Sequence, residues 1–185
     1  MRKISSFTFL TLNGFYKGPN EDTSWHRHGE EEGKFSEEQL KADNILVFGR
    51  TTYEMMYSFW PTPMAHELFP KVAVRMNQSE KLVVSDTLKE ATWENTGLLK
   101  GNVVEQVKSL KASPGKNLTI LGSGSIVSLL TDANQIDEYK IMIDPVVVGN
   151  GTPLFQGVKG KLDLKLTDTH VFKSGVVLLT YEKRV

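Results

Sequence analysis

The order of strand-like and helix-like segments is the feature that most restricts the fold of this chain. Short runs rich in β-branched and aromatic residues alternate with segments whose apolar residues repeat at helical spacing, and only strand-like runs follow Asp137. Such alternation predicts a mainly parallel central sheet with right-handed crossovers, flanked by helices. The fold class is therefore α/β. We expect a single domain over residues 1–185, because no repeat, linker or low-complexity tract divides the chain.

The expected strands are bounded by Gly, Asn, Asp or Ser. They cover residues 3–12, 45–48, 81–85, 118–121, 138–148, 162–172 and 176–182. The expected helices cover residues 36–41, begun by a pair resembling a capping box, and residues 51–57, 102–111 and 123–130. Only three residues, including Gly175, join the last two strands, which predicts an antiparallel C-terminal hairpin on a mixed sheet.

Charge balance and the lack of cysteine argue against several classes of function. The 22 Lys and Arg residues match the 22 Asp and Glu residues, so a broadly basic surface for nucleic acid is not expected. Without Cys the chain cannot use thiol chemistry, disulfides or zinc–cysteine sites. No apolar run approaches the roughly 20 residues of a membrane span, and no signal-peptide cleavage site follows the N-terminus. We therefore expect a cytoplasmic protein that binds neither nucleic acid nor membrane.

A long polar segment, residues 18–33, follows the first expected strand. It contains Trp25, His26, His28 and a run of three glutamates. Segments of this length tend to be functional or mobile, and Trp25 is an unusual residue to leave in water. The alternatives are a solvated acidic loop and a lid that closes over a site. For His26 and His28 a solvated loop is favoured over a metal site, because no third ligand follows at a defined spacing, and no metal is expected.

Two strand-to-helix turns have the composition of phosphate-binding sites. Gly49 and Arg50 begin one of them, and the run GSGS at residues 122–125 forms the other. A helix N-terminus presents free N–H groups and a partial positive charge, and Arg50 adds a guanidinium fork. Each turn alone is explained as well by a capped helix or a tight turn, and the second lacks the third small residue of the Rossmann fingerprint. Together they favour a dinucleotide at the carboxyl edge of the sheet.

Further along the chain two weaker signals follow strands. The hydroxyls of Ser85 and Thr87 suit a ribose or a phosphate. The run GNG at residues 149–151 follows a strand and is explained adequately by a turn.

Together these motifs resemble the dihydrofolate-reductase-like family, which includes the reductase domain of the bifunctional riboflavin-biosynthesis enzyme. The likeness runs nearly end to end. It is carried by residues 11–14 (TLNG), 48–54 (FGRTTYE), 83–85 (VVS), 121–125 (LGSGS), 136–139 (IDEY), 145–151 (PVVVGNG) and 154–155 (LF). The resemblance implies a mixed sheet of about eight strands, NADPH as hydride donor, and pairing as a homodimer.

The resemblance also implies roles for particular residues. On the cofactor side, Gly49, Arg50 and Thr51 would lie by the adenosine-side phosphates, Ser85 near the adenine ribose, and Gly122, Ser123, Gly124 and Ser125 around the pyrophosphate. On the nicotinamide and substrate side it would place the loop of Leu12, Asn13 and Gly14. We also expect Trp25, Gly149 and Gly151 on the substrate side.

Two residues depart from the family pattern. Many members have Asp where this chain has Asn13, and an amide cannot act as a general acid. Either water or another group protonates the substrate, with Asp22 and Glu21 as substitutes, or the substrate differs. Asp86 follows Ser85, and its carboxylate would repel a 2′-phosphate but accept hydrogen bonds from a free ribose. Asp86 thus favours NADH, whereas Arg50 favours NADPH.

The leading interpretation is an NADPH-dependent reductase of a small heterocyclic or carbonyl-type substrate. At family level this is a 5-amino-6-(5-phosphoribosylamino)uracil reductase. A pterin- or dihydrofolate-type reductase is an alternative, since a fold does not determine a substrate. A non-catalytic nucleotide-binding relative is another, favoured by Asn13, and a scaffold in which both glycine turns are purely structural is a third.

Overall fold

The computed structural model describes residues 1–184, and its core is one eight-stranded sheet of order β5-β4-β3-β6-β1-β7-β10-β9. The strands are β1 (Ile4–Thr11), β3 (Ile45–Gly49), β4 (Lys81–Val84), β5 (Thr96–Leu99), β6 (Leu118–Leu121), β7 (Glu138–Asp144), β9 (Leu164–Val171) and β10 (Val177–Lys183). All pairs from β5 to β7 are parallel, whereas β10 runs antiparallel to both β7 and β9. The mixed, mainly parallel sheet with an antiparallel C-terminal hairpin is thus confirmed.

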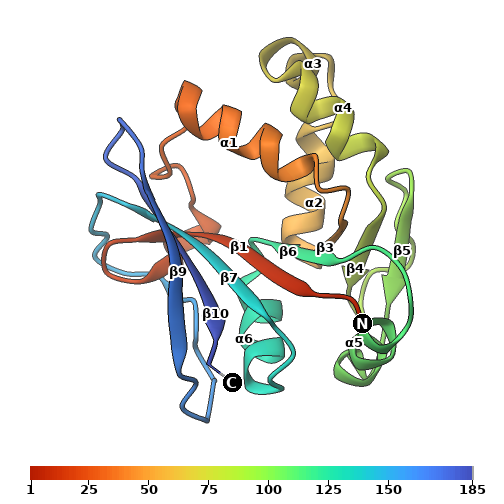
Figure 1. The fold of residues 1–185 in the computed structure, drawn as a ribbon. Coiled ribbons are helices and arrows are strands. Elements are labelled where there is room, and N and C mark those ends of the chain that lie inside the picture. Colours follow the sequence, from red (N-terminus) through yellow and green to blue (C-terminus); the bar gives the residue numbers. More distant parts are fainter. Residues whose placement is uncertain (185) are drawn as a thin grey trace.

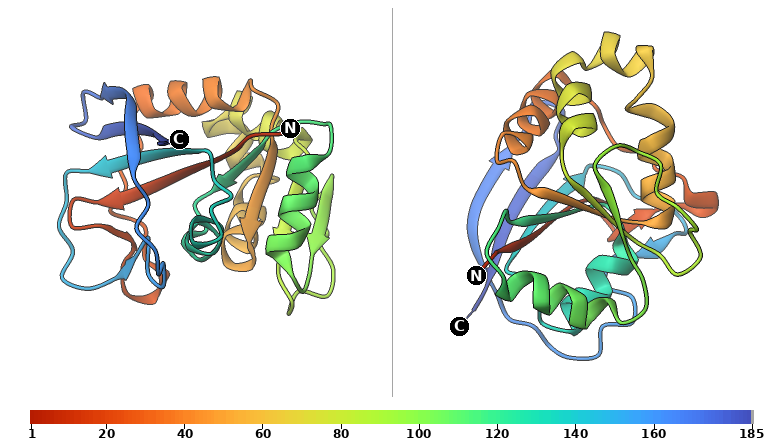
Figure 2. Two further views of the ribbon diagram at one scale, coloured as in Figure 1. Left: turned by 60° about the horizontal axis from the view of Figure 1, so that its bottom comes forward. Right: turned by 90° about the vertical axis from the view of Figure 1, so that its right-hand side faces the viewer.

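Helices cover both faces of this sheet (Figures 1 and 2). On one face lie α1 (Glu30–Leu40), α2 (Arg50–Phe59), α3 (Pro63–Leu68) and α4 (Pro70–Gln78), and on the other lie α5 (Val103–Ala112) and α6 (Gly124–Asp132). The central strand β3 shows why: Ile45 and Val47 belong to the core under α5 and α6, and Leu46 and Phe48 to the core under α2 and α4. A strand buried on both faces needs the continuous apolar run found here.

A small second sheet joins two loops beyond the main sheet. It pairs β2 (Phe15–Lys17) with β8 (Thr152–Pro153), and the short helix η1 (Pro19–Glu21) follows β2. These elements were not expected from the sequence, because each is too short to show a period.

The first helix begins earlier than the sequence pattern indicated. It starts at Glu30, so Ser36 lies inside α1 and does not cap it, and residues 30–33 are helical. Three glutamates in the first turn favour this start, because they face the positive end of the helix dipole.

One other boundary differs, and three elements were missed. Strand β7 ends at Asp144 because Pro145 follows, and proline cannot donate to a sheet. Helices α3 and α4 were not expected from the sequence. Each begins with a proline, Pro63 or Pro70, which suits a first helical turn. The four-residue strand β5 was missed because it is short and contains Gly97.

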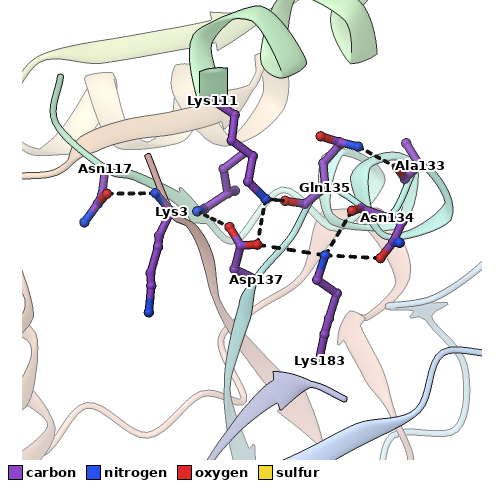
Figure 3. Close-up of polar contacts among 9 residues, drawn as sticks. Lys3, Lys111, Asn117, Ala133, Asn134, Gln135, Asp137 and Lys183 are labelled. Atoms are coloured by element: carbon purple, nitrogen blue, oxygen red, sulfur yellow. Dashed lines mark hydrogen bonds and ion pairs between the residues drawn. The ribbon is translucent and has the colours of Figure 1, made fainter. Parts of the chain in front are cut away.

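Asp137 ties together several elements at the amino edge of the sheet (Figure 3). Its Oδ2 accepts the backbone N–H of Ile4 at 2.9 Å, and its Oδ1 accepts a hydrogen bond from Nζ of Lys111 at 2.6 Å. Nζ of Lys183, in β10, lies 3.9 Å from the same oxygen and also donates to Asn134. The IDEY motif at residues 136–139 thus has a structural role through its aspartate.

Replacing Asp137 with Ala is expected to lower the free energy of unfolding by about 1–2 kcal/mol, because the N–H of Ile4 and the Lys111 ammonium lose their acceptor. Urea unfolding followed by circular dichroism measures the change. Asp163→Ala is the matched control, because the pair that Asp163 forms with Lys161 is well exposed to solvent and is expected to contribute at most about 0.5 kcal/mol. Equal effects of the two variants would contradict the role assigned to Asp137.

Within residues 1–184, no helix combines the length and the apolar content needed to cross a membrane.

Candidate functional site

A cavity of about 270 Å³ lies at the carboxyl edge of the sheet, where β3 and β6 end side by side. Helix α2 leaves β3 on one face and α6 leaves β6 on the other, so the cavity occupies a topological switch point, the usual ligand position in such sheets. The two glycine-containing turns therefore meet at one hollow. The cavity is lined by Tyr16, Lys17, Glu21, Gly49, Arg50, Thr51, Thr52, Val84, Ser123, Gly124, Ser125 and Ile126.

Ser123 joins the two turns directly. The backbone N–H of Gly49 donates to its Oγ at 2.9 Å, and the same hydroxyl donates to the carbonyl of Leu121 at 3.0 Å. Ser123 adopts a left-handed conformation, with φ at 50°, which turns the chain sharply from β6 into α6. This geometry aims both helix N-termini at the same space.

The first turns of α2 and α6 have backbone N–H groups that no side chain caps. Gly49 is the N-cap of α2, so neither Thr51 nor Thr52 caps that helix, and Ser123 makes no capping bond to α6. Neither first turn contains an acidic residue, whereas α1 and α5 both do. The positive ends of α2 and α6 are thus left for an anion from outside the chain.

Two cations border the cavity, each held by a glutamate. Nη1 of Arg50 lies 2.7 Å from Glu54, and Nζ of Lys17 lies 2.6 Å from Glu21. Burial acts to lower the pKa of Lys17, but the hydrogen bond and charge of Glu21 outweigh it and raise that pKa. Lys17 is therefore charged at neutral pH, and both side chains can turn toward an anionic ligand.

Tyr16 packs directly on the first residue of α6. A Cβ atom on Gly124 would lie 2.4 Å from the Tyr16 ring, so only glycine allows this contact. Sequence reasoning missed both Tyr16 and Lys17. The one available signal was their position just after the TLNG motif, and it is the pairing of β2 with β8 that brings them to the cavity.

Ser85 does not line the cavity. Its Oγ accepts the backbone N–H groups of Thr87 and Leu88, which closes a local turn. The carboxylate of Asp86 accepts the N–H of Gly101 at 2.7 Å. The ribose contact expected of Ser85 stays a prediction. The carboxylate of Asp86 is already engaged in a structural hydrogen bond.

The residues expected on the substrate side lie mostly in two loops that are bonded together. The N–H of Leu12 donates to Val146, and the Asn13 amide donates to the Val148 carbonyl at 2.8 Å. Gly151 lies so close to the carbonyl of Lys17 that a Cβ atom would come within 2.5 Å of it. Gly14 and Gly149, which were also expected on the substrate side, lie in the same two loops.

None of the expected proton donors is arranged to donate. The Asn13 amide accepts a hydrogen bond from Thr11 in addition to its bond to Val148. The backbone N–H of Ser24 bonds to Asp22 and lowers the pKa of that exposed carboxyl, which keeps it ionised. Glu21 is paired with Lys17. A general acid needs the opposite, a proton retained near neutral pH.

Trp25 and His26 show that residues 18–33 are not a freely solvated loop. The Trp25 indole donates to the carbonyl of Asp22 at 3.1 Å and is partly buried. The solvated position expected for His26 is wrong: this side chain is buried and lies 2.7 Å from the Asp144 carboxylate. A lid that includes His26 would have to break that bond.

Comparisons with known proteins identify the family of this chain. The model of the RibD C-terminal domain matches residues 2–178. The protein YyaP of Bacillus subtilis strain 168 is 30% identical over 181 residues, covering 97% of this chain and 94% of YyaP.

Two solved structures share the fold at low identity. One is a diaminohydroxyphosphoribosylaminopyrimidine deaminase/5-amino-6-(5-phosphoribosylamino)uracil reductase from Thermotoga maritima, with a TM-score of 0.68 and 14% identity, covering 99% of this chain and 57% of that one. The other is dihydrofolate reductase from Enterococcus faecalis complexed with NADP(H), with a TM-score of 0.66 and 17% identity, covering 99% and 97%. The chain therefore belongs to the RibD C-terminal domain family, which is of the riboflavin-biosynthesis reductase type.

Proposed function

We propose that the protein is an NADPH-dependent reductase that holds the coenzyme phosphates in the cavity between α2 and α6. The observation that carries this proposal is the meeting of two uncapped helix N-termini and two cations at one hollow. A dinucleotide has separated phosphates, and this arrangement offers two separate positive ends. The complex of the Enterococcus faecalis enzyme with NADP(H) supports the same cofactor class.

The residues present fit the coenzyme phosphates in charge and in hydrogen-bond donors. The turn formed by Ser123, Gly124 and Ser125 would bind the pyrophosphate through backbone N–H groups. Arg50 would bind the 2′-phosphate, because its planar fork matches a phosphate monoester. Lys17, which also lines the cavity, would add a second positive charge. Both cations would exchange a glutamate partner for a phosphate, an exchange between groups of like charge.

The chemistry supplied by a bound nicotinamide is a hydride. The loops around Asn13 and Gly149 would position an electrophilic substrate beside it, and their mutual hydrogen bonds keep that side of the site rigid.

At the finer level we propose 5-amino-6-(5-phosphoribosylamino)uracil as the substrate, in line with the family. Oxidation of NADPH followed at 340 nm with this pyrimidine, and separately with 7,8-dihydrofolate, distinguishes the two substrate classes. Tight NADPH binding without turnover of either would favour the non-catalytic relative.

Replacing Arg50 with Ala is expected to remove most of the preference for NADPH over NADH. The expected loss of NADPH affinity is about 10- to 100-fold, the usual effect of removing a charge-assisted bond to a phosphate, while NADH affinity stays within about threefold. Quenching of tryptophan fluorescence measures both dissociation constants. Arg75→Ala, an exposed arginine on α4, is the control. Equal affinities of the wild-type protein for the two cofactors would contradict the role of Arg50.

The homodimer expected from the resemblance stays a prediction. The edge strand β9 supports it, because Leu166 and Val171 expose 47% and 67% of their surface there.

A further inference from the structure

A buried histidine–aspartate pair lies at the carboxyl edge of the sheet, outside the cavity described above. Nδ1 of His26 lies 2.7 Å from Oδ2 of Asp144, and the backbone N–H of Arg27 donates to Oδ1 at 2.9 Å. Side-chain exposure is 3% for His26 and 0% for Asp144. Because the carboxylate accepts on both oxygens, Nδ1 carries the hydrogen of the bond it shares with Asp144.

The other ring nitrogen of His26, Nε2, is unbonded and keeps a small exposed area. Among residues 1–184, Nε2 has no hydrogen-bond partner, and it is not one of the buried unpartnered atoms, which are Arg2 Nε and Thr8 Oγ1. The ring stacks on Phe9 with centroids 3.6 Å apart, and His28 meets it edge-on at 4.5 Å. The stacking on Phe9 and the bond to Asp144 thus hold the imidazole in one orientation, with Nε2 unbonded.

The pair lies next to the place where the family pattern puts a proton donor. Asp144 is the last residue of β7 and pairs in register with Thr11, the last residue of β1. The hydroxyl of Thr11 donates to the Asn13 side chain at 2.8 Å. Thr11 therefore connects Asn13, which cannot donate a proton, to the His26–Asp144 pair, which can.

Anchoring the chain does not by itself explain a buried pair. The same segment is already fixed by Arg27, whose guanidinium donates to the carbonyl of Ser174 at 2.8 Å. Glu31 accepts the N–H of Lys173, and Glu32 bonds to the Ser174 hydroxyl. Removing a carboxylate from water is costly, and a buried pair is often no more stabilising than apolar packing. The segment does not need the His26–Asp144 pair as an anchor, so a function that uses a proton is the better explanation of the pair.

We propose that His26, oriented by Asp144, is the catalytic general acid that protonates the substrate, a role that rests on the proposed reductase function. The substrate carbon of a C=O or C=N group accepts the hydride, and the π electrons move to the oxygen or nitrogen. That atom takes the proton from Nε2 of the imidazolium, which becomes neutral imidazole. Solvent then returns a proton to Nε2. Asp144 is the positioning residue, because it fixes the ring and stabilises the imidazolium.

The test compares His26→Asn with His28→Asn in the full-length protein. Asn at position 26 keeps an N–H that can reach Asp144 but has no proton to release. With NADPH and 5-amino-6-(5-phosphoribosylamino)uracil we expect His26→Asn to lower kcat about 100-fold or more, the usual contribution of a general acid. KM, the NADPH dissociation constant and the melting temperature should stay near the wild-type values. His28→Asn, which removes a neighbouring imidazole, should keep kcat within about threefold of wild type.

A purely structural pair would behave differently. It would lower the melting temperature and change KM and NADPH affinity together with kcat. Asp144→Asn gives a second test, because it should lower kcat less than His26→Asn if Asp144 acts only through the ring of His26. A kcat within threefold of wild type for His26→Asn overturns the proposal.

A second readout keeps this inference separate from the reductase proposal. In ¹⁵N-histidine NMR spectra the ring signals of His26 are assigned by their loss in His26→Asn. Addition of NADP⁺ and the pyrimidine should shift Nε2 of His26 and leave Nδ1 nearly unchanged. If the wild-type protein does not turn over the pyrimidine, the reductase proposal fails for that substrate. The absence of an Nε2 shift would then contradict the proposal that His26 contacts the ligand, whereas a shift would support that contact.

Discussion

Replacing Ser125 with Asp is expected to lower NADPH affinity about 100-fold without unfolding the protein. Ser125 is exposed in the first turn of α6 and lines the cavity, so a carboxylate there would face the pyrophosphate. The same charge is favourable to the helix itself, because it lies at the positive end of the dipole. Binding and stability should therefore change in opposite directions, which separates loss of the ligand from loss of the fold.

The matched control for this prediction is Ser125→Asn, which is nearly the same size as Asp but uncharged. Its NADPH affinity should stay within about threefold of wild type, because no like charges are brought together. Tryptophan quenching measures binding, and thermal unfolding shows whether Ser125→Asp keeps or slightly raises the melting temperature. If both variants bind NADPH as well as the wild type does, the phosphates do not lie at the N-terminus of α6.

Replacing Lys81 with Met is expected to cost about 3 kcal/mol of unfolding free energy, or about 10 °C in melting temperature. Lys81 is 1% exposed. Its Nζ donates to the carbonyls of Met76, Asn77 and Ser79 at 3.0, 3.0 and 2.6 Å. It also lies 4.6 Å from the centre of the Trp93 ring. This one cation satisfies the open carbonyls at the end of α4.

The protonation of Lys81 supports this assignment. Burial lowers its pKa to about 8, so the ammonium is still the main form at pH 7. Three carbonyl partners require three protons, which only the ammonium provides. Methionine has a similar length but would leave those carbonyls unpaired. Lys89→Met, at an exposed position, is the control and should change stability by less than about 0.5 kcal/mol. Chemical denaturation at pH 7 compares the two, and equal effects would contradict the role of Lys81.

Local sequence signals determined the layout of the fold and part of the site. The run at residues 45–48 indicated a strand, and Gly175 indicated the C-terminal hairpin, because these signals depend on neighbouring residues alone. The composition of the turns at Gly49 and Gly124 likewise indicated phosphate binding. Neighbouring residues could not show whether the turns face each other. That depends on β3 lying beside β6 in the sheet, although six elements separate the two strands in the chain.

Tertiary structure alone decided the remaining features of the site. Tyr16 and Lys17 reach the cavity only because β2 pairs with β8, and a three-residue strand has no readable period. His26 and Asp144 are 118 residues apart, and no residue near either one in the chain indicates that the other is its partner. Polar residues become buried partners when distant strands and loops close around them. The sequence therefore determined which segments form strands, helices and turns, whereas long-range packing determined which polar groups meet and exclude water.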